Sequence, residues 1–211
     1  MLLKNPGDTA AAVLSLAMGI GANATICTWV KAVLLNPLPA VPEPGRMLVL
    51  APAARDGSER SLSHPNFRDI RARATTFDLL GQEQTLISVS DGGQSERAFA
   101  MLVSGNYFDV VGVEPILGRG FLPEEDTTPN GAPVVVLSHS FWQRRFAGAP
   151  GVVGQQVKVN DRPYTVVGVM PAAFIGTALG LAADAWVPLM QQPELQAAGN
   201  RLRVRGHRWV E

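Results

Sequence analysis

The chain has almost no cysteine and no excess of charge of either sign. Cys27 is the only cysteine among 211 residues, which excludes an internal disulfide framework and a cysteine-rich metal site. Lysine plus arginine number 18, aspartate plus glutamate also 18, and the formal net charge is zero. Nucleic-acid binding relies on a clustered basic excess. The composition therefore predicts no nucleic-acid partner.

Few lysines are present, and none fits a nucleotide-binding loop. Lys4, Lys31 and Lys158 are followed by Asn, Ala and Val, whereas a Walker A lysine precedes Ser or Thr. The segment Ser90-Asp91-Gly92-Gly93-Gln94 is similar to the Ser-Gly-Gly-Gln signature of ABC ATPases with one residue inserted. It lies between two strand-like runs, where Asp-Gly-Gly favours a tight turn. We predict a hairpin turn and no ATPase site.

Patterns for catalysis and for metal binding are also missing. His64, His139 and His207 are widely separated, and no His-x-x-x-His pair occurs. Ser138 precedes His139 without a Gly-x-Ser-x-Gly elbow, so we predict that Ser138 caps a helix. The acidic triplet Glu124-Glu125-Asp126 is predicted to lie in a solvated loop. The sequence predicts no catalytic residue, no metal ligand and no cofactor, and hence no enzyme.

Two short glycine pairs resemble parts of a dinucleotide fingerprint. Gly19-Ile20-Gly21 and Gly118-Arg119-Gly120 both lack a third glycine and a strand-then-helix context. The second pair follows the apolar Ile116-Leu117 and is predicted to permit a sharp loop. Neither pair predicts a cofactor site.

One long run carries no charge, from Thr9 to Val30. As a helix it would span roughly 33 Å at about 1.5 Å per residue, enough for a bilayer core of about 30 Å. We predict a transmembrane helix over residues 9–35, preceded by a short N-terminal segment, residues 1–8; the charges do not give its orientation. Gly19, Gly21 and Asn23 are the residues expected to pack against other helices.

The same run allows a second interpretation. Ala22-Asn23-Ala24 has the spacing of a signal-peptide cleavage site, which would release a soluble periplasmic binding or adaptor domain. The apolar character continues beyond it, through Trp29 and Val30 to Leu35, where a mature soluble protein would turn polar. The membrane helix is therefore the first hypothesis and the cleaved signal the alternative.

The remainder is predicted to be an α+β domain, a mixed α/β arrangement of short strands and helices over residues 47–211. A proline-rich connector, residues 36–46, leads into it. Alternating or continuous apolar runs predict strands, and Ser-x-x capping patterns predict helices. The predicted strands are Met47–Leu50, Thr85–Ser90, Arg97–Val103, Val134–Leu137, Gln156–Asn160 and Tyr164–Val169; helices are expected after Ser63 and Ser138 and over Asn106–Val111.

Three arginines near the C-terminus alternate with apolar residues. Arg201, Arg203 and Arg205 flank Leu202 and Val204, so a strand would place the three guanidinium groups on one face. Two interpretations follow: the polar face of a sheet, or a surface for an anionic partner or lipid headgroups. These arginines are the candidate interaction residues of the sequence.

Two longer segments resemble a known family. "VSGNYFDVVGVEPILGRGFLPEED" (Val103–Asp126) and "GAPVVVLSHSFWQRRFAGAPGVVGQQVKVNDRPYTVVGVMPAAF" (Gly131–Phe174) are similar to the MacB-like periplasmic core domain of ABC-transporter permeases. "LSLAMGIGANATICTWVKAVLLNPLP" (Leu14–Pro39) resembles the first transmembrane helix before that domain, especially in the large duplicated orphan permeases of acidobacteria.

The resemblance implies a protein of the bacterial inner membrane with a cytoplasmic N-terminus, residues 1–8, and its C-terminal domain in the periplasm. Its implied partners are other permease helices or subunits, a separate cytoplasmic ABC ATPase and a periplasmic partner. The implied role is to couple ATP-driven motion to the periplasm, as in mechanotransmission and efflux. Relatives continue beyond such a domain into further membrane helices, so the chain is expected to be a fragment of a longer reading frame or a degraded copy, with its domain incomplete at the C-terminus.

Overall fold

A computed structural model describes residues 6–30, 38, 40–50, 61–178, 180–197 and 199–210. The chain divides into two compact units, Met1–Pro39 and Ala40–Glu211, which are treated separately below. The first five residues of the predicted cytoplasmic N-terminus and residues 31–35 of the predicted membrane span lie outside the described residues.

Unit 1 consists of one long helix, α1 (Pro6–Val30). Proline suits the first helical position because its missing N–H would have no partner there. Val13, Leu14, Leu16, Met18 and Ile20 are each 60–75% exposed. Among the helices that the structure describes, none is long and apolar enough to cross a membrane.

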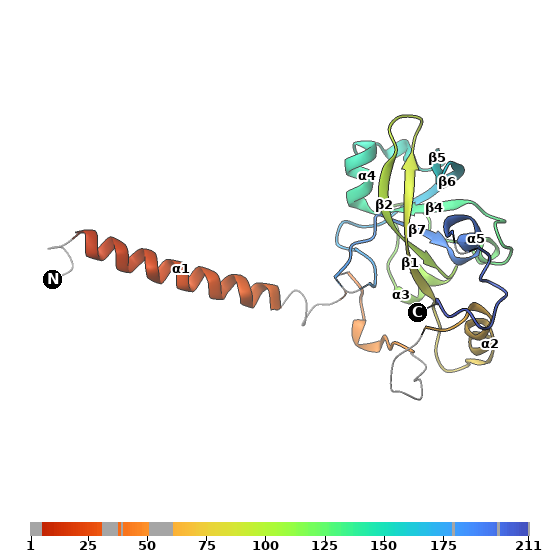
Figure 1. The fold of residues 1–211 in the computed structure, drawn as a ribbon, viewed down its shortest axis with the longest axis horizontal. Helices are drawn as coiled ribbons and strands as arrows, with labels where there is room; N and C mark the ends of the chain where they lie inside the picture. The colour runs from red at the N-terminus through yellow and green to blue at the C-terminus, as the bar shows by residue number, and fades with distance from the viewer. Residues whose placement is uncertain are drawn as a thin grey trace. The chain divides into compact units, whose positions relative to one another are not determined.

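Unit 2 is built on one mixed sheet that closes on itself (Figure 1). Its order is β3-β6-β4-β7-β2-β1-β5, and β5 pairs again with β6. The pairs β2–β7 and β4–β6 are parallel and the others antiparallel. The strands are β1 (Gln82–Ser90), β2 (Glu96–Val103), β3 (Leu117–Gly118), β4 (Val134–Leu137), β5 (Gln156–Val159), β6 (Arg162–Val169) and β7 (Ala185–Pro188).

Helices cover the outside of this ring and its ends. Ser63 accepts a hydrogen bond from the Asn66 amide at the start of α2, and Ser138 from the Phe141 amide at the start of α4, as the capping patterns predict. The helices are α2 (His64–Arg73), α3 (Tyr107–Val111), α4 (His139–Phe146) and α5 (Gln192–Leu195); the short 3-10 helices are η2 (Pro44–Arg46), η3 (Pro123–Asp126), η4 (Pro150–Val152) and η5 (Leu189–Gln191).

Alternate residues of the strands fill the interior of the ring. Because successive side chains of a strand point to opposite faces, each strand contributes every second residue. Burial of apolar surface at roughly 25 cal/mol per Å² then stabilises the closed sheet. The buried strand residues of this core are Ile87, Val89, Ala98, Ala100, Leu102, Val135, Leu137, Val157, Val159, Tyr164, Val166, Val169, Ala185 and Val187.

A second apolar layer lies on the outer face of β7. Trp186 stacks on Phe174 with ring centroids 5.3 Å apart and meets Phe108 edge-on at 5.8 Å. Phe108 also contacts Phe121 at 5.4 Å. Since β7 is covered on both faces, all four of its residues are buried, which explains its uninterrupted apolar sequence.

Tight turns occur where the sequence predicts them. The β1–β2 hairpin turns at Asp91-Gly92-Gly93, with φ +100° at Gly92. The β5–β6 hairpin turns at Asn160 and Asp161, with φ of 47° and 66°. Two successive positive φ values are the geometry of a type I′ turn, which favours Asn and Asp. Both predicted hairpins are confirmed.

Two predicted strands are wrong. Met47–Leu50 is extended but pairs with no described strand, and Leu48 is 94% exposed. Arg201–Arg205 forms turns instead of a strand. A short apolar or alternating run forms a strand only where it can pair with a free sheet edge. Here the sheet closes on itself without these two segments.

Close approach at β3 explains one of the glycine pairs. β3 meets β6 where β6 has an extra residue relative to β4, at Val167. A Cβ at Gly118 would lie 2.1 Å from the Val167 carbonyl oxygen, and its φ is +70°. Only glycine fits both conditions, which confirms the predicted sharp loop.

Candidate functional site

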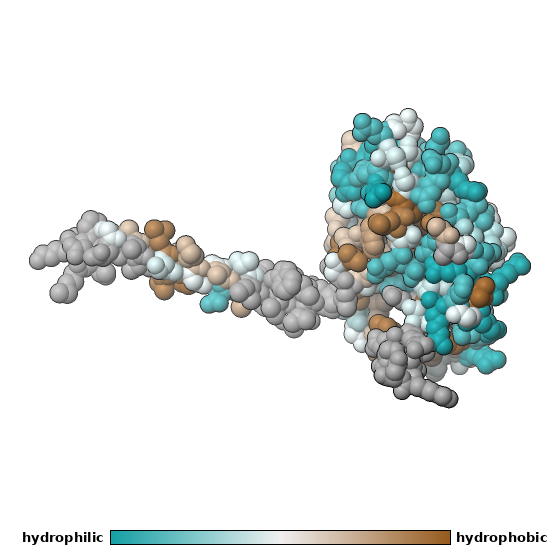
Figure 2. Space-filling model, in the orientation of Figure 1, coloured by the Kyte–Doolittle hydropathy of each residue, from teal (hydrophilic) through white to brown (hydrophobic). Residues whose placement is uncertain are grey.

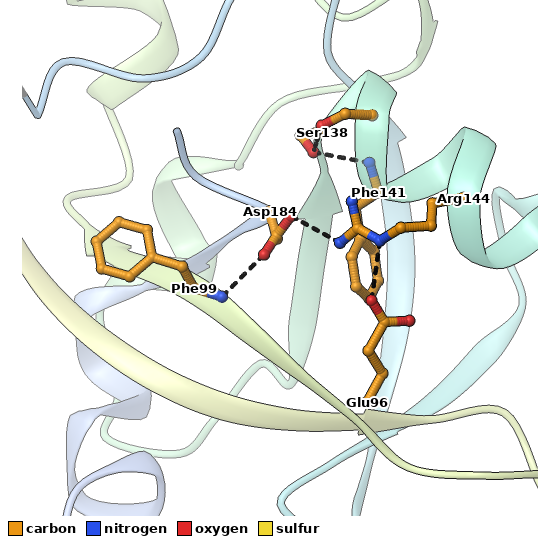
Figure 3. Close-up of polar contacts among 7 residues, drawn as sticks. Glu96, Phe99, Ser138, Phe141, Arg144 and Asp184 are labelled. Atoms are coloured by element: carbon orange, nitrogen blue, oxygen red, sulfur yellow. Dashed lines mark hydrogen bonds and ion pairs between the residues drawn. The ribbon is translucent and has the colours of Figure 1, made fainter. Parts of the chain in front are cut away.

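Arg144 of α4 joins three separate elements at one end of the ring (Figure 3). Its guanidinium donates to Glu96 Oε1 at 2.9 Å and to Asp184 Oδ1 at 3.0 Å. Asp184 in turn accepts from the Phe99 amide at 3.0 Å. The positive charge also lies over the Phe141 ring, 5.2 Å from its centroid. These contacts hold α4, β2 and the start of β7 in a fixed arrangement.

Arg145, the next residue of α4, stabilises the tip of the β1–β2 hairpin. Arg145 donates to Asp91 Oδ1 at 2.5 Å and to the Gln94 carbonyl oxygen at 2.6 Å. The turn is further closed by the Gly92 amide, which donates to Ser90 Oγ at 3.3 Å. The segment that is similar to an ATPase signature is thus a braced turn, as predicted.

Replacing Arg144 with glutamine is expected to lower the free energy of unfolding by about 0.5–1.5 kcal/mol. The guanidinium is half-exposed, so each ion pair is screened and contributes about 1 kcal/mol or less. Urea denaturation measures the change, and a cycle with Glu96→Gln isolates the pair. Arg97→Gln, at an exposed arginine that makes no ion pair within the described chain, should change little. Equal losses at both arginines would contradict this assignment.

A bidentate ion pair organises the loop between β3 and η3. Arg119 donates to Glu125 Oε1 at 2.7 Å and to Oε2 at 2.9 Å, and the Leu122 amide donates to Oε2 at 2.8 Å. Burial alone would raise the pKa of Glu125, but these donors outweigh it and hold the pKa below its usual value. The prediction of a solvated acidic loop is wrong for Glu125, which is buried.

Asp126 is the most perturbed carboxyl group of the loop. Its Oδ2 accepts from the Gly105 amide at 2.8 Å, and Arg71 lies 4.0 Å away. Its Oδ1 is also buried. Burial raises the pKa of Asp126 to about 6, against the opposing effects of the Gly105 amide and the Arg71 charge. No local pattern signals this residue, because its partners come from distant parts of the chain.

The predicted arginine row does not form one face. Arg201 is mostly buried, 3.8 Å from Glu83, with its guanidinium 5.1 Å from the Trp209 ring centroid. Arg205 is exposed and pairs with Asp69 at 2.7 Å. Arg203 is exposed. Because a turn replaces the expected strand, the side chains diverge; their role as an interaction surface stays a prediction.

Ser138, His139 and His64 make capping and packing contacts. Ser138 Oγ caps α4 and lies 3.1 Å from Ser140 Oγ. His139 packs edge-on against Trp142. His64 is buried in another part of unit 2, where its Nδ1 lies 3.0 Å from the Leu202 carbonyl oxygen, and burial lowers its pKa. In the described part of the chain no three His, Cys, Asp or Glu side chains form a metal-binding group.

The helix-packing candidates lie along α1. A Cβ at Gly19 or Gly21 would meet nothing within 4 Å. Asn23 is exposed on the same helix, and Thr25 Oγ1 donates to the Gly21 carbonyl oxygen at 2.8 Å. Nothing described in this chain covers the small-residue surface, so the predicted packing is untested.

Comparison with solved structures places the fold beside transporter domains. The periplasmic region of MacB from Actinobacillus actinomycetemcomitans matches with a TM-score of 0.53 at 20% identity, over 70% of this chain and 64% of that one. The extracellular domain of the noncanonic ABC-type transporter YknZ from Gram-positive bacteria matches with a TM-score of 0.52 at 15% identity, over 67% and 68%. The chain thus spans less than two thirds of the MacB region.

Comparison of sequences gives the family. No curated protein matches the chain. The family described as "MacB-like periplasmic core domain" matches residues 9–209 of the chain. This range begins inside α1 and includes almost all of unit 2. The chain therefore belongs to the family of the MacB-like periplasmic core domain.

Proposed function

We propose that this chain is the membrane-anchored periplasmic domain of an ABC-type permease, and that it couples the motion of a separate cytoplasmic ATPase to the periplasm. The observation that carries the proposal is the family match from residue 9 to residue 209. The match includes most of the N-terminal helix as well as the closed sheet, so both are part of the same family domain.

Anchoring by α1 is supported by its exposed apolar side chains and by the absence of charged residues from Thr9 to Val30. The 25 residues of α1 extend about 37 Å at about 1.5 Å per residue. Gly19, Gly21 and Asn23 interrupt its apolar character, and such helices pack their small and polar residues on neighbouring helices within a membrane. We propose that other permease helices supply these neighbours and that unit 2 faces the periplasm.

The proposal that unit 2 transmits motion is supported by its closed sheet and by the ion pairs and hydrogen bonds of its arginines. A domain that is moved by membrane helices must keep its shape under load. The closed ring leaves few unpaired strand edges. Arg144 and Arg145 link α4 to the start of β7 and to the β1–β2 turn, and Arg119 links the segment after β3 to η3. We propose that the domain acts by rigid-body motion and by contact with a periplasmic partner, and that it catalyses no reaction.

Carbonate extraction and protease access test this assignment. We expect the full chain to stay in the carbonate-insoluble membrane fraction with an unprocessed N-terminus. Protease added after the outer membrane is opened should degrade unit 2 and leave α1 protected by lipid. As a control, a cytoplasmic protein in the same cells should survive intact.

Two results would overturn the proposal in different ways. A mature chain that begins at Thr25 in the soluble fraction would establish the secreted alternative. Resistance of unit 2 to protease until the inner membrane is lysed would place the domain on the cytoplasmic side. In both cases an association with a permease and its ATPase would lose its physical basis.

A further inference from the structure

Two segments of unit 2 hold a large share of its positive charge. Residues 61–80 and 199–210 contain seven of the 18 lysines and arginines but only two of the 18 acidic residues, Asp69 and Asp78. Their net charge of +5 (seven minus two) contrasts with a chain whose formal net charge is zero. The arginines are Arg68, Arg71, Arg73, Arg201, Arg203, Arg205 and Arg208.

The fold brings these two segments side by side. Leu62 and Val210 form an antiparallel bridge, and the Leu62 amide donates to the Val210 carbonyl oxygen at 2.7 Å. The His64 ring stacks on Trp209 with centroids 6.1 Å apart. Arg205 donates to Asn66 Oδ1 at 2.8 Å. α2 and residues 199–210 therefore present one surface, called the basic surface below.

Four arginines of the basic surface are exposed and available. Arg68, Arg73, Arg203 and Arg208 are exposed and make no hydrogen bond or ion pair with any described residue. Arg205 and Asp69 form an exposed pair, and Arg71 is 39% exposed above Asp126. Exposed guanidinium groups that pair with no carboxylate among the described residues favour an anionic partner.

Exposed apolar side chains lie at the same end of unit 2. Figure 1 shows residues 40–50, α2 and the C-terminus at one end of the domain, opposite the β1–β2 hairpin tip. Leu48 is 94% exposed, Val49 88% and Phe77 55%. Figure 2 shows that this end is largely hydrophilic with isolated apolar areas. Arginines beside exposed apolar and aromatic side chains are typical of surfaces that meet a lipid headgroup layer.

The short connection between α1 and unit 2 favours the membrane as the partner of the basic surface. Only nine residues, 31–39, separate α1 from Ala40. At no more than about 3.5 Å per residue they reach about 30 Å. If α1 lies in the bilayer, Ala40 can lie no farther than about 30 Å from the end of α1, so the membrane surface is within reach of unit 2.

We infer that the basic surface formed by α2 and residues 199–210 binds the headgroups of anionic phospholipids in the membrane that holds α1. This inference rests on the proposed membrane anchoring. The contact orients unit 2 on the bilayer. Movement of the membrane helices then reaches the ring both through the chain connection to α1 and through the lipid contact. Each arginine near an anionic surface strengthens membrane contact by a factor of about five, and salt weakens the contact.

A fluorescent label on the surface tests the contact in the full chain. Val204 is 40% exposed between Arg203 and Arg205, so Val204→Cys in a Cys27→Ser background accepts a nitrobenzoxadiazole label. The chain is placed in nanodiscs that carry a nitroxide-labelled lipid, with phosphatidylcholine alone or mixed with phosphatidylglycerol. We expect quenching that requires phosphatidylglycerol and disappears at high salt.

Charge variants provide matched controls. Arg68→Gln with Arg208→Gln should lower the equilibrium constant for lipid contact at least about tenfold. Arg97→Gln with Lys158→Gln removes the same charge at exposed positions near the hairpin end and should leave quenching unchanged. A label at Gln94→Cys, in the hairpin loop, should show no quenching in either lipid.

Insertion of α1 is measured separately through the native Cys27. Protection of Cys27 from an impermeant maleimide together with quenching independent of phosphatidylglycerol would overturn the lipid inference and leave the anchoring intact. Reaction of Cys27 would overturn the anchoring itself. A label that responds to soluble polyglutamate but not to phosphatidylglycerol would assign the surface to an acidic protein and also overturn the inference.

Discussion

Replacing Trp186 with alanine is expected to lower the free energy of unfolding by about 3–5 kcal/mol, the range for removal of a fully buried large aromatic side chain. Trp186 has no exposed surface and contacts both Phe174 and Phe108. Its loss leaves a cavity under the 170–183 loop on the outer face of β7. Urea unfolding of the full chain, followed by near-UV circular dichroism, measures the change.

Two further substitutions show whether the effect comes from the aromatic layer. Trp186→Phe keeps an aromatic ring that can stack on Phe174, so its loss should be well below that of alanine. Leu86→Ala, at a residue 67% exposed, should cost less than about 0.5 kcal/mol. A loss at Trp186→Ala as small as that at Leu86→Ala would contradict the second apolar layer.

Asp126 is expected to make the domain less stable as the pH rises from about 4 to about 6. In the folded state burial raises its pKa from 3.8 to about 6. Between these values the folded carboxyl holds a proton that the unfolded chain has lost, so unfolding releases a proton and stability falls with rising pH. At about 1.4 kcal/mol per pH unit the decrease approaches about 3 kcal/mol. Above pH 6 this contribution is constant.

Asp126→Asn isolates the effect of this carboxyl group. The amide keeps an oxygen that can accept from the Gly105 amide, and it carries no titrating proton. We expect the variant to match the parent near pH 4 and to exceed it in stability near pH 7, by up to about 3 kcal/mol. Parallel stability curves for parent and variant from pH 4 to pH 7 would show that Asp126 does not titrate in this range.

Local patterns predicted the elements whose cause is local. The caps Ser63 and Ser138 accept from amides three residues ahead, and the two hairpin turns depend on Asn, Asp and Gly at adjacent positions. β4, Val134–Leu137, was predicted with its observed bounds, because a short, fully apolar run fits a strand covered on both faces.

Predictions that needed knowledge of a neighbour were wrong. Met47–Leu50 has the composition of a strand but no strand partner, and Arg201–Arg205 alternates like a strand but forms turns. Asp126 looked solvated because its partner Gly105 lies 21 residues away in the chain. For these residues the deciding contact comes from another part of the chain, whereas the ion pair of Glu125 with Arg119 spans only six residues and was missed although it is local.

The amino-acid sequence by itself determined the family, the uncharged N-terminal run, the turns and most strands and helices, since composition, spacing and short-range hydrogen bonding are properties of neighbouring residues. Only the tertiary structure decided the closed ring, the buried Asp126 and the basic surface. A ring closes through pairs such as β1–β5, and the basic surface forms through the pair Leu62–Val210. Such contacts join residues that are far apart in the chain, and their formation depends on how the whole apolar surface can be buried.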